Sequence, residues 1–176
     1  MTTTIDGPLT EVSRYIDELE ARMHVHGPDD RQRIRRHVHA LRQEQANALA
    51  VARHAPDRID DRVARLRSRL EVAERSFDAD LAESRSAFTA AVDGELQGWD
   101  VFAERLQTTA AARTGTARAQ AEAGVTDLRR RRLAVSDRLD DLRVDRWETW
   151  HEQRKRVTAA RDELERTADD LSASLF

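Results

Sequence analysis

Cysteine is absent from the chain, and proline, glycine and aromatic residues are scarce. Without cysteine, the protein has no disulfide bonds, no thiolate zinc site and no cysteine nucleophile. Three prolines and six glycines in 176 residues leave long stretches in which nothing interrupts a helix. An aromatic content of 5% beside a charged content of 36% is typical of long helices and coiled coils. The composition therefore predicts an all-α protein without strands.

The chain also lacks a long apolar run and an excess of charge of one sign. No stretch approaches the roughly 18 apolar residues that a membrane-spanning helix needs. The opening residues TTTIDGPLTEVS have neither the basic start nor the apolar core of a signal peptide. The 30 basic and 33 acidic residues nearly cancel, which leaves a net charge of −3. We therefore expect a cytoplasmic protein, while export by a route that needs no cleaved signal stays open.

Motifs of catalysis and cofactor binding are missing as well. The chain has no G-x-x-x-x-G-K-[ST] or G-x-G-x-x-G phosphate loop, no G-x-S-x-G nucleophile elbow and no H-E-x-x-H zinc motif. Serine, histidine and aspartate all occur, but side chains along a helical rod have no pocket in which to converge. The sequence therefore predicts a protein that is not an enzyme and has no cofactor.

What the chain does have is an apolar repeat at spacings of three and four residues, which indicates amphipathic helices. The repeat breaks at Gly27-Pro28, at Pro56 and at Gly115. These signals predict four helices, at about residues 9–26, 29–54, 57–112 and 117–174. When the chain is folded back at the three breaks, apolar positions of neighbouring helices meet in phase. The predicted fold is an antiparallel coiled coil.

The unequal helix lengths predict an uneven bundle within a single domain of residues 1–176. The two short helices cover only part of the two long ones. Residues 1–83 and 147–176 would form a short up-down-up-down four-helix base. Residues 84–147 would project from this base as a long two-helix hairpin arm. Because two helices alone bury little surface, we expect such an arm to need a partner or a second copy of itself.

Four of the six histidines lie in two HVH tripeptides, one on either side of Gly27-Pro28. Residues two apart on a helix point about 200° away from each other, so neither tripeptide chelates one metal by itself. The predicted register brings this turn close to Trp150 and to the E-x-x-H formed by Glu148 and His151. The candidate metal ligands are therefore His26, Glu148 and His151. A pH-responsive contact with the tryptophans and plain solvated histidines are the alternatives, of which solvated histidines are favoured.

The densest cationic feature is the run RRRRL at residues 129–133. Arg132 is expected on the seam of the arm, opposite Trp99, where its guanidinium would stack on the indole ring. Arg129, Arg130 and Arg131 would cover the outside and form a candidate site for nucleic acid or another polyanion. The facing helix supplies acidic residues that should neutralise much of this charge, which favours a salt-bridged solvated face; they are Asp93, Glu95, Asp100 and Glu104.

Several apolar residues of the arm lie beside its main stripe, where two helices cannot bury them. They are the candidate partner-binding residues: Val101, Phe102, Leu133 and Val144, with Phe88 and Trp99 nearby. The alternative is that these residues simply widen the seam.

Together these features predict a scaffold, adaptor or assembly subunit that acts through helix–helix contacts of the arm and forms a homo-oligomer. One alternative is binding of nucleic acid or another polyanion through Arg129–Arg132. Another is an amphipathic coat on a lipid or polymer surface, for which the bundle would have to open.

Overall fold

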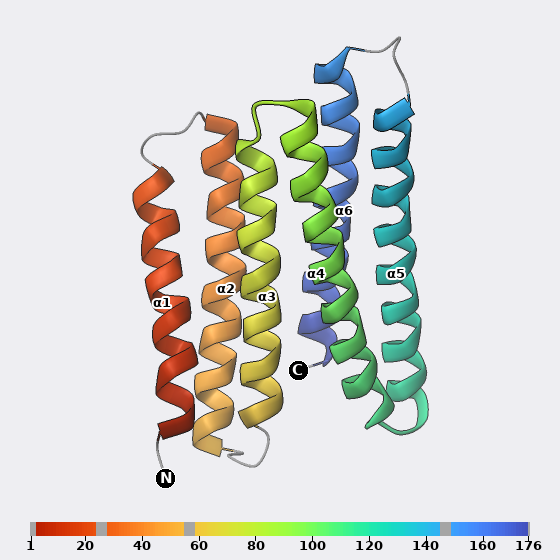
Figure 1. Ribbon diagram of the computed structural model, residues 1–176. Helices are drawn as coiled ribbons and strands as arrows, with labels where there is room; N and C mark the ends of the chain where they lie inside the picture. Colours follow the sequence, from red (N-terminus) through yellow and green to blue (C-terminus); the bar gives the residue numbers. More distant parts are fainter. Residues whose placement is uncertain (1–2, 24–27, 55–58, 145–148, 176) are drawn as a thin grey trace. The chain divides into compact units, whose positions relative to one another are not determined.

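The computed structural model describes residues 3–23, 28–54, 59–144 and 149–175. These residues form helices joined by turns, which confirms the predicted all-α class (Figure 1). The helices are α1 (Thr3–Met23), α2 (Pro28–His54), α3 (Ile59–Leu81), α4 (Arg85–Ala111), α5 (Gly115–Val144) and α6 (Trp150–Leu175).

The chain divides into two compact units, Met1–Leu81 and Ala82–Phe176. The first unit contains α1, α2 and α3, and the second contains α4, α5 and α6. Within each unit, successive helices run antiparallel and pack side by side (Figure 1). Each helix is amphipathic, so the apolar stripes of three helices meet in one core per unit.

The predicted helix 57–112 is two helices in the structure, because the chain breaks at residues 82–84. Ser84 has extended backbone angles, with φ −118° and ψ 155°. Its hydroxyl accepts a hydrogen bond from the backbone N of Ala87 at 3.2 Å. Such an N-cap satisfies one of the N–H groups that the first turn of a helix leaves without a partner. α4 therefore begins as a new helix at Arg85.

The predicted helix 117–174 is also two helices, with α5 ending at Val144 and α6 beginning at Trp150. The backbone N of Glu152 donates a hydrogen bond to the Thr149 hydroxyl at 3.4 Å. Threonine followed three residues later by glutamate is the pattern of a capping box at a helix start. This signal is present in the sequence, but no proline or glycine accompanies it, so the prediction treats residues 117–174 as one helix.

These two breaks divide the chain differently from the predicted base and arm. Residues 150–175 turn back and pack along α5 within the second unit. The approach is close at Gly124, where a Cβ atom would lie only 2.5 Å from Leu171 Cδ1. The helices of residues 84–144 therefore do not stand alone as a two-helix arm, because a third helix covers them.

The core of the first unit uses the apolar stripes that the sequence predicts. Its largest fully buried side chains come from all three helices and are Leu19, Ile34, Leu41, Leu66 and Phe77. Tyr15 and Leu81 pack against this cluster and are partly buried. Burial of one such side chain stabilises the fold by about 1.5–3 kcal/mol, so these stripes dominate the packing.

The second unit has a core of the same kind between α4, α5 and α6. Its buried aliphatic residues include Val92, Leu96, Leu106, Val125, Leu139, Leu142, Val157 and Leu164. Gly115 joins α4 to α5 with a φ of +59°, in the left-handed region where a Cβ atom is strained. The turn predicted at Gly115 thus depends on a residue without a side chain.

Candidate protein-interaction surface

Three of the six predicted partner-binding residues are exposed in the second unit. They are Val101 on α4, and Leu133 and Val144 on α5. Leu133 keeps 57% of its surface exposed and Val144 keeps 78%, whereas their neighbours Val135, Leu139 and Leu142 are fully buried. α5 therefore places large aliphatic side chains on two opposite sides, and only one of these sides contributes to the core.

The other three predicted partner-binding residues, Phe88, Trp99 and Phe102, are buried. Trp99 packs edge-on against Phe102 with the ring centroids 5.6 Å apart. Phe88 packs edge-on against Trp150 of α6, with 5.3 Å between the centroids. The prediction is corrected for these three residues, because the third helix that the predicted arm lacked is present. They stabilise the unit and are not available to a partner in this structure.

Leu133 and Val144 lie on the same side of α5 although eleven residues separate them. Eleven residues turn an α-helix through about three full turns, to within about 20° of the starting direction, over roughly 16 Å. We use the name α5 outer face for the exposed residues along this side: Thr126, Arg129, Arg130, Leu133, Asp137, Asp140 and Val144.

The charges on the α5 outer face are segregated along the helix. Arg129 and Arg130 precede Leu133, and Asp137 and Asp140 follow it. Arg130 forms an ion pair with Asp127 of the same helix, and Arg143 donates to Asp140 at 2.6 Å. Exposed pairs of this kind contribute only a few tenths of a kcal/mol, so these groups exchange partners at little cost.

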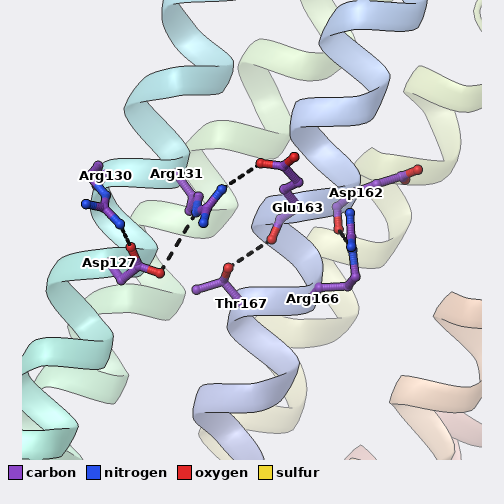
Figure 2. A network of polar contacts seen from close by, with 7 residues as sticks. All are labelled: Asp127, Arg130, Arg131, Asp162, Glu163, Arg166 and Thr167. Atoms are coloured by element: carbon purple, nitrogen blue, oxygen red, sulfur yellow. Dashed lines mark hydrogen bonds and ion pairs between the residues drawn. The ribbon is translucent and has the colours of Figure 1, made fainter.

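The remaining arginines of the run point to neighbouring helices instead of outward. Arg131 Nη1 donates to Glu163 of α6 at 2.6 Å, and its Nε lies 3.9 Å from Asp127 (Figure 2). Arg132 is predicted to lie opposite Trp99. In the structure it donates to Asp100, the residue after Trp99 on α4, at 2.9 Å. The expectation that Arg129, Arg130 and Arg131 all cover the outside is thus corrected for Arg131.

Figure 2 shows how Arg131 links α5 to α6. Arg131 forms ion pairs with Asp127 of α5 and with Glu163 of α6. Asp127 also forms an ion pair with Arg130. One turn further along α6, the Thr167 hydroxyl donates to the Glu163 carbonyl oxygen at 2.9 Å. Of these contacts, the Arg131–Glu163 ion pair joins α5 to α6, and the others lie within one helix.

A buried ion pair joins α4 to α6. Arg161 Nε donates to Glu95 Oε2 at 2.6 Å, and the two side chains are only 6% and 4% exposed. Trp99 Nε1 donates to the second carboxylate oxygen of Glu95 at 3.2 Å. The sequence predicts that Glu95 helps to neutralise the arginine run, whereas in the structure Glu95 pairs with Arg161. Periodicity could not find this pair, because its two residues are 66 positions apart.

Two of the three candidate metal ligands are residues that the structure does not describe. His26 and Glu148 lie outside the described residues, and His151 is exposed on α6. In the described part of the chain, no three histidine, aspartate or glutamate side chains gather in a way that could hold a metal. His37 is buried, with Nε2 3.8 Å from an Asp80 oxygen, while His39 is exposed. The two histidines of this tripeptide thus have opposite environments, as their spacing predicts.

Comparisons with known proteins identify no relative. The chain matches no protein-family model, no curated protein and no solved structure. Within the described ranges, no helix has the length and apolar character to cross a membrane.

Proposed function

We propose that this protein is a non-enzymatic assembly or adaptor subunit that binds a protein partner through the α5 outer face. The observation that carries the proposal is the exposure of Leu133 and Val144 on one side of a helix whose other side forms the core. The side of a helix that contacts only water usually carries polar residues, such as Asp137 and Asp140 between these two positions. Two large aliphatic residues on that side therefore indicate a contact with another protein.

The energy from the two exposed aliphatic side chains can be compared with the cost of association. Full burial of Leu133 and Val144 contributes about 1.5–3 kcal/mol for each side chain. Association of two proteins costs an estimated 4–15 kcal/mol in lost translational and rotational freedom. Two aliphatic side chains therefore do not hold a complex alone, and the charged residues around them must contribute and select the partner.

Polyanion binding through Arg129, Arg130 and Arg131 has weaker support. Arg131 is held between Asp127 and Glu163, so the outward-facing cluster has two arginines instead of three. Phosphate binding draws its affinity from the number of cations that face the ligand. The same α5 face also presents Asp137 and Asp140, which would repel a polyanion.

A photo-crosslinking experiment tests the proposal. Benzoylphenylalanine replaces Thr126, which is exposed on the α5 outer face and whose hydroxyl donates to the Glu122 carbonyl oxygen of its own helix. The matched control replaces Thr108 of α4, which is likewise exposed and donates to the Glu104 carbonyl oxygen. Irradiation is carried out on the purified protein and in a native cell extract.

The proposal predicts a protein adduct at position 126 in at least one of the two samples, with little adduct at position 108. Leu133→Glu should abolish the adduct at 126, because a buried carboxylate without a partner destabilises the contact. Absence of adducts at position 126 in both samples would refute the proposal. Equal yields at positions 126 and 108 would refute it as well.

A further inference from the structure

The partner of the α5 outer face can be inferred from its charges. We infer that this face binds a second copy of the chain in antiparallel orientation, about a two-fold axis beside Leu133. The inference rests on the proposed function and names its partner. Three properties of the described residues support it: the order of charges along α5, the position of Leu133 within that order, and the small residues available opposite Val144.

The order of charges distinguishes the two possible orientations. In a parallel pair of α5 helices, Arg129 and Arg130 would face the same arginines of the other copy, and Asp137 would face Asp137. In an antiparallel pair centred beside Leu133, Arg130 of each copy faces Asp137 of the other. A two-fold axis repeats this attraction, so each copy supplies one arginine and one aspartate to the same interface. The face is therefore complementary to itself in one orientation and repulsive in the other.

The apolar residues fit the same arrangement. Leu133 lies beside the axis, so the two exposed leucines pack against each other at the centre of the contact. Val144 of one copy then lies opposite Ala123 of the other, and both residues are exposed in the single chain. Alanine permits close approach of the helices, which allows the valine side chain to be covered. Both large exposed aliphatic residues of α5 are thus removed from water in one register.

The charged residues that face the contact are free to form it. Asp137 lies on the exposed side of α5, and among the described residues Arg130 is ion-paired with Asp127, one turn earlier in its own helix. Arg129 Nη1 reaches Gln107 of α4 at a long 3.5 Å. The Arg129–Gln107 bond is long and exposed, and the Arg130–Asp127 pair lies within α5, so breaking these contacts costs little. Pairing with a second copy therefore requires no change in the fold.

Charge reversal tests the inference by sedimentation velocity on the full chain. Arg130→Asp places two aspartates opposite each other, and Asp137→Arg places two arginines opposite each other. Each variant alone should raise the dimer dissociation constant by about tenfold or more, since like charges then meet twice across the axis. An equimolar mixture of the two variants should dimerise with a dissociation constant within about threefold of that of the unmodified chain. In a mixed dimer both contacts again join opposite charges.

Arg138→Asp is the matched control, because it makes the same change of charge on an exposed α5 residue outside the outer face. It should leave the dissociation constant unchanged, and circular dichroism should show the same helicity for all variants. Failure of the mixture to associate would overturn the inference.

A chain that stays monomeric up to several hundred micromolar would also overturn it. That result leaves the proposed function intact if the probe at position 126 still forms an adduct with a different protein in cell extract. If that adduct is absent too, both the inference and the proposed function are refuted.

Discussion

Replacing Arg161 with methionine is expected to destabilise the second unit strongly. Arg161 Nε lies 2.6 Å from Glu95 Oε2, and both side chains are almost completely shielded from water. The variant leaves the Glu95 carboxylate buried with Trp99 Nε1, at 3.2 Å, as its remaining donor among these contacts. Removing one partner of a buried ion pair costs about 3–5 kcal/mol. A unit of this size is stable by roughly 5–15 kcal/mol, so a substantial part of its stability should be lost.

The double variant Glu95→Leu/Arg161→Met separates the loss of the pair from the loss of packing. It removes both charges together and keeps side chains of similar volume. Well-packed apolar replacements of a buried ion pair are often neutral or stabilising. The Trp99 N–H loses the Glu95 oxygen as an acceptor, at a cost of up to about 1–3 kcal/mol. The double variant should therefore unfold within about 2 kcal/mol of the unmodified chain, and it should be more stable than Arg161→Met.

Urea unfolding followed by tryptophan fluorescence measures this unit specifically. All three tryptophans lie between residues 82 and 176, whereas Tyr15 is the only tyrosine and belongs to the first unit. A cost below about 1 kcal/mol for Arg161→Met would show that solvent reaches the pair. A cost for the double variant equal to the sum of the costs of Glu95→Leu alone and Arg161→Met alone would show that the two side chains do not interact. Either result would refute the reasoning.

Two further predictions concern a turn and a titrating group. Gly115→Ala should lower the free energy of unfolding by about 1–2 kcal/mol, because φ is +59° at this position. The control Gly7→Ala in α1 should be neutral or stabilising by up to about 1 kcal/mol. Equal effects of the two substitutions in urea unfolding would contradict the prediction. Burial, followed by the charges of Glu74 and Asp78, raises the pKa of Tyr15 above its ordinary value of 10.0. The folded chain thus keeps a proton that the unfolded chain loses, so the first unit should lose stability as the pH rises above about 10. Tyr15→Phe should remove this dependence in urea unfolding at pH 9 and 11; an unchanged slope would exclude Tyr15 as its cause.

The helices and their inner sides follow from the sequence because periodicity is a local property. Apolar residues three and four apart lie on one side of a helix wherever that helix packs. The same geometry assigns Leu133 and Val144 to the opposite side of α5, and both are exposed there. The turn at Gly115 is equally local, since only a residue without a Cβ atom adopts its backbone conformation without strain.

The ends of the helices and the burial of the aromatic residues depend on tertiary structure. The apolar repeat continues through Ser84, so spacing alone does not distinguish one straight helix from two capped ones. The return of α6 along α5 decides that Phe88, Trp99 and Phe102 are buried, and that Arg131 faces Glu163. Burial depends on which segment packs against a face, and that segment lies far away in the chain. The sequence by itself thus determines which residues share a side of a helix, and the tertiary structure decides whether that side meets water or another helix.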